Sequence, residues 1–152
     1  MAHDPFQDRL HEIPEEIQPA LLAVVTDFIG LPGAPGTLSF YGPPTSQFRE
    51  FVAEEAHIGE TDVLGVTSSH SFRLAVSDGG ADLAVRAASI MQDDVMDELG
   101  ALWPELVTPR ATTATVLEPG ISDSGEAQWQ SGALSCPIGE LRHAFGHLIR
   151  HI

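Results

Sequence analysis

Three histidines near the carboxyl end of the chain are spaced like the ligands of a helical metal site. His143, His147 and His151 follow one another at intervals of four residues, which places their imidazoles along one stripe of an α-helix. Two histidines one turn apart chelate zinc or nickel, and a catalytic zinc adds a carboxylate and an open position for water. His143 and His147 are therefore candidate metal ligands, and a metal-dependent enzyme is one hypothesis for this chain.

The same stripe has a simpler explanation. On a helix, His143 would lie about 160° from Phe145 and so away from the apolar seam, where we expect the histidines to face solvent. Histidines in the last turns of a helix also complement the negative end of its dipole. No glutamate follows His143, so the His-Glu-x-x-His pattern of zinc proteases is absent.

Four acidic residues gather near the end of the most regular helical pattern in the chain. Asp93 and Asp97 are one turn apart, and so are Asp94 and Glu98. Carboxylate pairs bind a hard cation or act as an acid–base pair in a cleft, although a surface helix also carries such charges as plain solvated residues. Like charges at this spacing cost a few tenths of a kcal/mol per pair. Asp93, Asp94, Asp97 and Glu98 are therefore candidate partner-binding residues, with a plain solvated face as the simpler alternative.

Tyr41 and Cys136 are two further candidates, each with a structural alternative. Tyr41 lies in a short aromatic stretch before Gly42; if exposed, it would add to a partner-binding surface. Cys136 precedes a proline where a helix is expected to begin, a place where a thiolate can be stabilised, yet no histidine or asparagine partner is placed beside it. We expect a small buried cysteine or a helix N-cap. Phosphate-binding and dinucleotide-binding glycine motifs are absent, so no cofactor is expected.

Charge and composition exclude several classes of partner. The 152 residues include 22 acidic side chains against seven basic ones, all arginine, for a formal net charge of −15. Nucleic acids and anionic membranes require a basic surface, so we expect neither as a partner. The amino terminus lacks the cationic start and apolar stretch of a secretory signal, and the longest apolar run, 20–25, is too short to cross a bilayer. We expect a cytoplasmic protein.

The residue pattern predicts a single α+β domain over 1–152, with a small, mainly antiparallel sheet, three to four helices and an amphipathic C-terminal helix. A loop rich in proline and glycine covers 31–36, and an irregular, strand-containing segment covers 105–135. Helices are expected near 4–12, 14–29, 46–57, 81–102 and 138–152, strands near 37–41, 114–117 and 127–130, and a β-hairpin over 62–77 with its turn at 68–71.

Part of the chain resembles a group of small uncharacterised proteins from GC-rich Gram-positive bacteria. The resemblance rests on the helix 92–99, of the form Gln-Asp-x-Val-x-Glu-x-Leu with Asp97 at the Glu position, on Trp103-Pro104, on Trp129 and on the Ile-Gly-x-Leu segment at 138–141. Members of the group place Cys-Pro and His after the Trp-Pro pair, whereas this chain has Glu105-Leu106-Val107-Thr108. The departure leaves that segment without a metal role, and the resemblance implies no activity.

Three hypotheses about function follow. The first is a non-enzymatic protein that binds a basic partner through its acidic surface, as an immunity-type inhibitor, a chaperone or an assembly component; charge of this size accelerates association. The second is a metal-dependent enzyme centred on the histidine stripe. The third is a structural or regulatory module that forms homo-oligomers through an apolar helix face over 138–152. The first is favoured, because no catalytic motif is assembled in the sequence.

Overall fold

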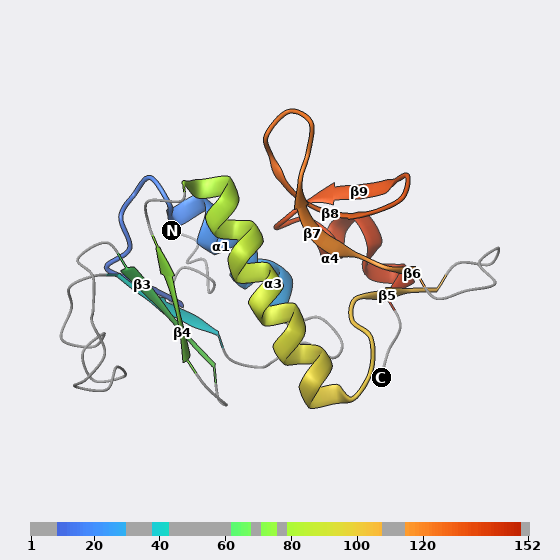
Figure 1. Cartoon of the computed structure of the whole chain (residues 1–152), viewed down its shortest axis with the longest axis horizontal. Helices are drawn as coiled ribbons and strands as arrows, with labels where there is room; N and C mark the ends of the chain where they lie inside the picture. Colours follow the sequence, from blue (N-terminus) through green and yellow to red (C-terminus); the bar gives the residue numbers. More distant parts are fainter. Residues whose placement is uncertain are drawn as a thin grey trace, which may run out of the picture.

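Two helices form the centre of the molecule (Figure 1). The computed structural model describes residues 9–29, 38–42, 62–67, 71–75, 79–107 and 115–149. Helix α1 covers Gln18–Phe28 and helix α3 covers Gly80–Leu99. Pro19 lies in the first turn of α1, where no backbone N–H is needed. Helix α3 ends at Gly100, which adopts the left-handed conformation and donates its N–H to the carbonyl of Met96 at 2.9 Å.

A four-stranded sheet lies on one side of the helix pair (Figure 1). It consists of β1 (Leu10–His11), β2 (Ser39–Tyr41), β3 (Asp62–Val66) and β4 (Ser71–Ala75), in this order. Strands β1 and β2 are parallel, and the other two pairs are antiparallel. Gly65 of β3 faces Phe72 of β4, and the Phe72 ring occupies the place that a side chain at Gly65 would need.

The C-terminal half of the chain forms two smaller sheets. Strands β5 (Glu105–Leu106) and β6 (Thr115–Val116) make a short antiparallel pair. Strands β7 (Glu118–Ile121), β8 (Ala127–Ser131) and β9 (Leu134–Pro137) make a continuous antiparallel meander. The chain then forms helix α4 (Leu141–Phe145) and the 3₁₀ helix η3 (Gly146–Leu148).

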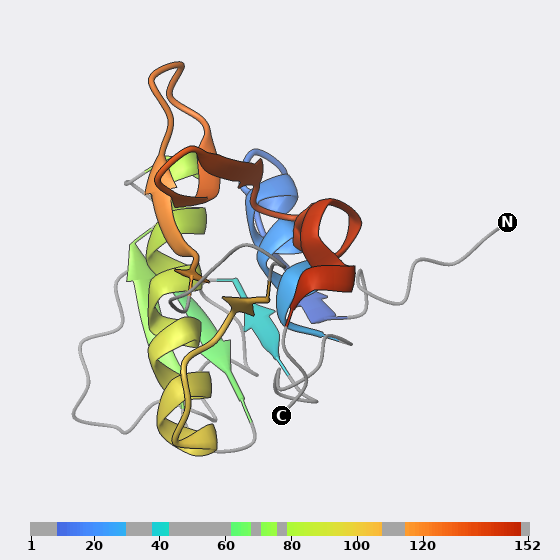
Figure 2. The same ribbon diagram turned by 90° about the vertical axis from the view of Figure 1, so that its right-hand side faces the viewer.

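The core lies where these layers meet on the two long helices. The meander packs on α3 through β7 and β8, and α1 packs beside α3; Figure 2 shows the two helices flanked by strands of both halves. Three aromatic rings join the layers: Phe28 of α1 lies 5.0 Å from Trp103 and 5.8 Å from Trp129, measured between ring centroids. All three side chains are fully buried.

The expected architecture of one small sheet packed with three to four helices is wrong. The described residues form three separate sheets and three α-helices, and strands dominate the C-terminal half. The strong helical spacing in 14–29 and 81–102 corresponds to α1 and α3. The expected helix near 4–12 is wrong at its described end. Leu10 and His11 form strand β1 and pair with Phe40 and Tyr41 of β2. The expected helix near 46–57 and the loop 31–36 lie outside the described residues.

The expected amphipathic helix over 138–152 is also wrong, because helix α4 has only five residues. The backbone N–H of Ile138 donates to the carbonyl of Ala127 at 3.2 Å, which extends the pairing of β9 with β8. Gly139 then adopts a φ of 106°, outside the helical region. Helical geometry therefore begins only after this turn. In the part of the chain that the structure describes, no helix combines the length and apolar character needed to cross a membrane.

Candidate functional site

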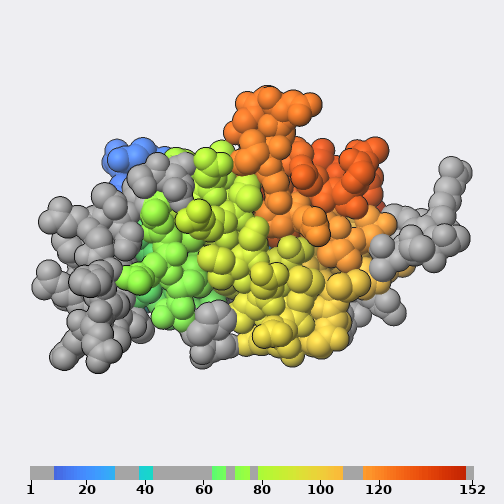
Figure 3. Space-filling view, in the orientation of Figure 1, coloured from blue at the N-terminus to red at the C-terminus, as the bar shows by residue number. Residues whose placement is uncertain are grey.

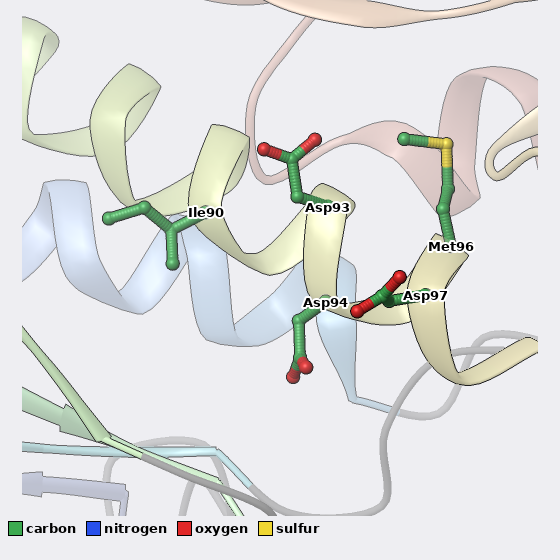
Figure 4. Close-up of a pocket in the computed structure, with 5 residues that line it drawn as sticks. All are labelled: Ile90, Asp93, Asp94, Met96 and Asp97. Carbon is green, nitrogen blue, oxygen red and sulfur yellow. The ribbon is translucent and has the colours of Figure 1, made fainter.

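The acidic residues of α3 lie on the side of the helix away from the core. Leu83, Ala87, Met91 and Val95 are buried against α1 and the meander. This packing turns Asp93, Asp97 and Glu98 outward, where they are exposed, and leaves Asp94 half-buried. In the view of Figure 4 the side chain of Asp93 lies above the α3 ribbon and that of Asp94 below it, with Asp97 between them in height. The carboxylates thus spread over one broad helix surface.

Three of these carboxylates line an open depression of about 630 Å³. It is lined by Ile90, Asp93, Asp94, Met96 and Asp97, so apolar and acidic side chains alternate along it (Figure 4). The carboxyl-terminal half of α3 forms a continuous part of the visible surface in Figure 3. We call these five residues, together with Glu98, the acidic face.

The acidic face carries its charge at the unfavourable end of its helix. Asp93 to Glu98 occupy the last two turns of α3, and the last turn contains no basic residue. Asp97 lies in the last turn, where a carboxylate meets the negative end of the dipole at a cost of about 0.3–1 kcal/mol. Like charges one turn apart add a few tenths of a kcal/mol. The Asp93–Asp97 pair therefore lowers the stability of the helix.

The structure does not bring Tyr41 into the acidic face. Tyr41 of β2 stacks on His11 of β1, with ring centroids 4.5 Å apart and ring planes 10° apart. The two residues are neighbours in the parallel pairing of β1 with β2, and Tyr41 is half-buried. Its ring therefore belongs to a cross-strand aromatic pair.

The two candidate metal ligands lie on different kinds of helix. His143 belongs to α4 and His147 to η3, and both side chains are exposed. In a 3₁₀ helix a residue advances by about 120°, so the change of helix type interrupts the single stripe that the spacing predicts. Among the described residues, no group of three or more His, Cys, Asp or Glu side chains is arranged to hold a metal ion. His151 lies outside the described residues.

A buried carboxyl that the sequence analysis missed occupies the junction of the two halves. Asp27 of α1 is completely buried. Its Oδ2 accepts the indole N–H of Trp129 at 2.8 Å and the backbone N–H of Gly139 at 2.6 Å, and its Oδ1 accepts the N–H of Leu141 at 3.1 Å. One side chain thus holds β8 and the turn before α4 against α1.

Burial dominates the electrostatics of Asp27. Loss of water raises the pKa of its carboxyl from 3.8 to about 6, although the three N–H donors lower it and the charge of Glu140 raises it further. The sequence does contain a signal for this buried carboxyl. Asp27 lies inside the apolar stretch 20–29, three residues after Val24 and one before Phe28. Helical spacing places such a residue on the buried face.

A second buried polar side chain, Gln92, connects α3 to the C-terminal half. Its Nε2 donates to the carbonyl oxygen of Trp103 at 3.0 Å and to that of Leu117 at 2.6 Å. Only 6 % of the residue is exposed. Gln92 therefore gives a donor to two backbone carbonyls and joins α3 to the C-terminal half.

Cys136 is buried on β9, as the sequence suggested, but in a strand and not at a helix start. Burial, with the charges of Asp27 and Glu140, raises the pKa of its thiol to about 12. The thiolate is the reactive form, so the native protein at pH 8 should react with iodoacetamide at least about a hundredfold more slowly than the urea-unfolded chain. Mass spectrometry over time measures both rates at the single thiol of the chain. Equal rates would contradict the burial of Cys136.

Comparison of the chain with models of protein families, with curated proteins and with solved structures finds no match.

Proposed function

We propose that this chain is a non-enzymatic protein that binds a basic protein partner through the acidic face of α3, in the manner of an immunity-type inhibitor, a chaperone or an assembly component. The observation that carries the proposal is the open depression in which Ile90 and Met96 lie among Asp93, Asp94 and Asp97. Protein interfaces combine apolar contact with charges that steer the partner. The net charge of −15 favours a cationic partner at long range.

The cost of the acidic face supports the same proposal. Helix α3 would be more stable with neutral residues in place of Asp93 and Asp97. A bound basic surface offsets this cost, because it supplies the opposite charge that the last turn of α3 lacks. The electrostatic cost is therefore smaller in a complex with a basic partner than in the free protein.

The homo-oligomer hypothesis has less support, because the apolar residues on which it depended pack within the chain. Leu141 and Ile149 are buried, and Ile149 forms a bridge with Leu106 of β5. The metal-enzyme hypothesis has no group of ligands among the described residues to support it.

The proposal is tested with a pair of matched double variants. D93N/D97N removes two exposed carboxylates from the acidic face, and D123N/E126Q removes two exposed carboxylates from the turn between β7 and β8. The tagged chain captures proteins from a lysate of its source organism at low salt, and the association rate of the captured protein is then measured for each variant. At low ionic strength we expect D93N/D97N to reduce this rate about tenfold and D123N/E126Q to leave it within about twofold of wild type.

The salt dependence provides the second readout. We expect the wild-type association rate to fall steeply between low and physiological salt and the D93N/D97N rate to fall less. D93N/D97N should also unfold at a slightly higher temperature than wild type, because it relieves repulsion in α3. Equal loss of binding in both double variants would contradict a site on α3, and salt-independent binding would contradict a basic partner.

A further inference from the structure

A polar hollow of about 550 Å³ lies on the outer face of the meander. Trp129 and Cys136 alternate along β8 and β9 with residues of the hollow and are buried, so the hollow opens away from the core. Its volume is within the range of about 300–1,000 Å³ that is usual for ligand pockets. It shares no residue with the acidic face. Its side chains are those of Val116, Glu118, Gln128, Gln130, Ser131 and Ser135.

The pairing of the strands brings these polar groups together. Glu118 of β7, Gln130 of β8 and Ser135 of β9 are direct partners across the sheet, so their side chains lie on one face. Gly120 of β7 is the partner of Gln128. A Cβ at Gly120 would collide with the amide end of the Gln130 side chain. The absence of a side chain at Gly120 therefore allows the amide of Gln130 to lie over β7.

A hydrogen bond between the two glutamines fixes which of their groups a ligand can reach. Nε2 of Gln128 donates to Oε1 of Gln130 at 2.8 Å. The oxygen of Gln128 and the NH₂ group of Gln130 have no further hydrogen-bond partner in the described part of the chain. Glu118 adds a carboxylate that accepts, and Ser135 adds a hydroxyl that both donates and accepts. Donors and acceptors thus lie side by side in the hollow.

This mixture of groups discriminates among classes of ligand. A guanidinium or ammonium group only donates hydrogen bonds, so it would face the NH₂ group of Gln130 with another donor. An anion would be repelled by the carboxylate of Glu118 and by the net charge of −15. Among the described residues that line the hollow there is no aromatic ring on which a flat base could stack. A neutral ligand that is polar on every side meets all three conditions.

We propose that the hollow is a binding site for a neutral saccharide. Each sugar hydroxyl both donates and accepts a hydrogen bond, so two neighbouring hydroxyls match the free oxygen of Gln128 and the free NH₂ group of Gln130. Glu118 accepts from a third hydroxyl. Gly120 acts as a positioning residue, because it leaves room for the amide of Gln130. Without an aromatic platform, the Kd of the site is expected in the millimolar range.

NMR titration tests the site directly, because the side-chain NH₂ groups of Gln128 and Gln130 give their own signals. The probes are maltose, cellobiose and N,N′-diacetylchitobiose, each added at millimolar concentration to the ¹⁵N-labelled chain. We expect at least one of these disaccharides to shift both NH₂ signals in a saturable manner. The indole N–H of Trp129 should not shift, since it lies on the opposite face of β8 and is bonded to Asp27.

Two variants and a matched control separate binding in the hollow from binding elsewhere. G120A moves the amide of Gln130 without removing any polar group, and the flexible end of that side chain is what must shift. E118Q removes the carboxylate of the hollow, and E126Q removes an exposed carboxylate from the turn between β7 and β8. We expect G120A and E118Q to weaken binding at least about fivefold and E126Q to leave it within about twofold of wild type.

Three results would overturn the proposal. The first is the absence of saturable shifts at Gln128 and Gln130 with all three disaccharides. The second is wild-type affinity in G120A while its Trp129 signal shows an unchanged fold, because the arrangement of the two amides would then be irrelevant to binding. The third is tighter binding of N-acetylargininamide than of every disaccharide, which would indicate a site for a cationic side chain.

Discussion

Replacing Asp27 by alanine is expected to lower the free energy of unfolding at pH 5 by about 4 kcal/mol, because three N–H groups at the junction lose their acceptor. These groups are the Trp129 indole and the amides of Gly139 and Leu141. The alanine also leaves a cavity beneath the turn, since the carboxyl is completely buried. Urea denaturation followed by tryptophan fluorescence measures the change, because Trp129 lies at the site of the substitution.

The isosteric variant D27N separates the hydrogen bonds of Asp27 from its charge. The amide oxygen of asparagine still accepts two of the N–H groups, but its NH₂ group faces the third donor. At pH 4 we expect a loss of about 1–2 kcal/mol relative to wild type, corresponding to one unsatisfied donor.

The pH dependence of this difference has a definite sign. The pKa of Asp27 is about 6 in the folded chain and 3.8 at its ordinary value, so the folded chain keeps a proton that the unfolded chain loses. The stabilising contribution of Asp27 is therefore complete below about pH 4 and is lost as the pH rises through 6. The advantage of wild type over D27N should shrink by about 2 kcal/mol between pH 4 and pH 7.

Wild type and D27N share every other carboxyl group, so the contribution of those groups to the pH dependence of stability cancels in the difference between the two proteins. A difference between the two proteins that stays constant with pH would show that the pKa of Asp27 is not raised. An alanine variant as stable as wild type would show that the three N–H groups find other acceptors.

The second large effect is expected at Gln92, where the isosteric change to glutamate exchanges a donor for a negative charge. Nε2 of Gln92 faces two carbonyl oxygens, those of Trp103 and Leu117. A carboxylate in this position would be buried, without a donor and repelled by both carbonyls. We expect Q92E to lose about 4 kcal/mol of unfolding free energy at pH 7.

Protonation distinguishes this mechanism from simple misfit. The buried carboxyl of Q92E should retain its proton well above the ordinary pKa of glutamate, and the protonated form has one O–H to donate. Urea denaturation at pH 5 should therefore recover part of the loss seen at pH 7.

Q92L is the control that has no charge and no donor. Loss of the donor to the two carbonyls should cost about 2 kcal/mol at both pH values. If Q92E and Q92L are equally stable at pH 7, or if Q92E does not respond to pH, Gln92 does not act as the paired donor described above.

Elements with strong local patterns could be predicted because their signals lie in neighbouring residues. The apolar steps from Leu83 to Leu99 identified α3, and the alternating residues in 62–77 identified the hairpin of β3 and β4. The acidic face was also accessible, because a helical period that buries Met91 and Val95 places Asp93 and Asp97 on the opposite side.

Elements that depend on distant partners were predicted poorly. Leu10 and His11 have helical spacing with the residues that follow them, yet they pair with β2. Similarly, the spacing of Leu141 and Phe145 indicates a long helix, but β9 pairs with β8 through Pro137 and delays the helix start. In each case hydrogen bonds to a strand elsewhere in the chain outweigh a local preference worth only tenths of a kcal/mol per residue.

The charge, the two long helices and the outward position of the acidic face follow from residue types and their spacing, because helical period and net charge are local or additive properties. The position of Asp27 under the C-terminal turn has a different origin. Its three donors lie 102, 112 and 114 residues further along the chain. A residue so far from its partners acquires its burial and its raised pKa only when folding has brought the two halves together and removed water from between them.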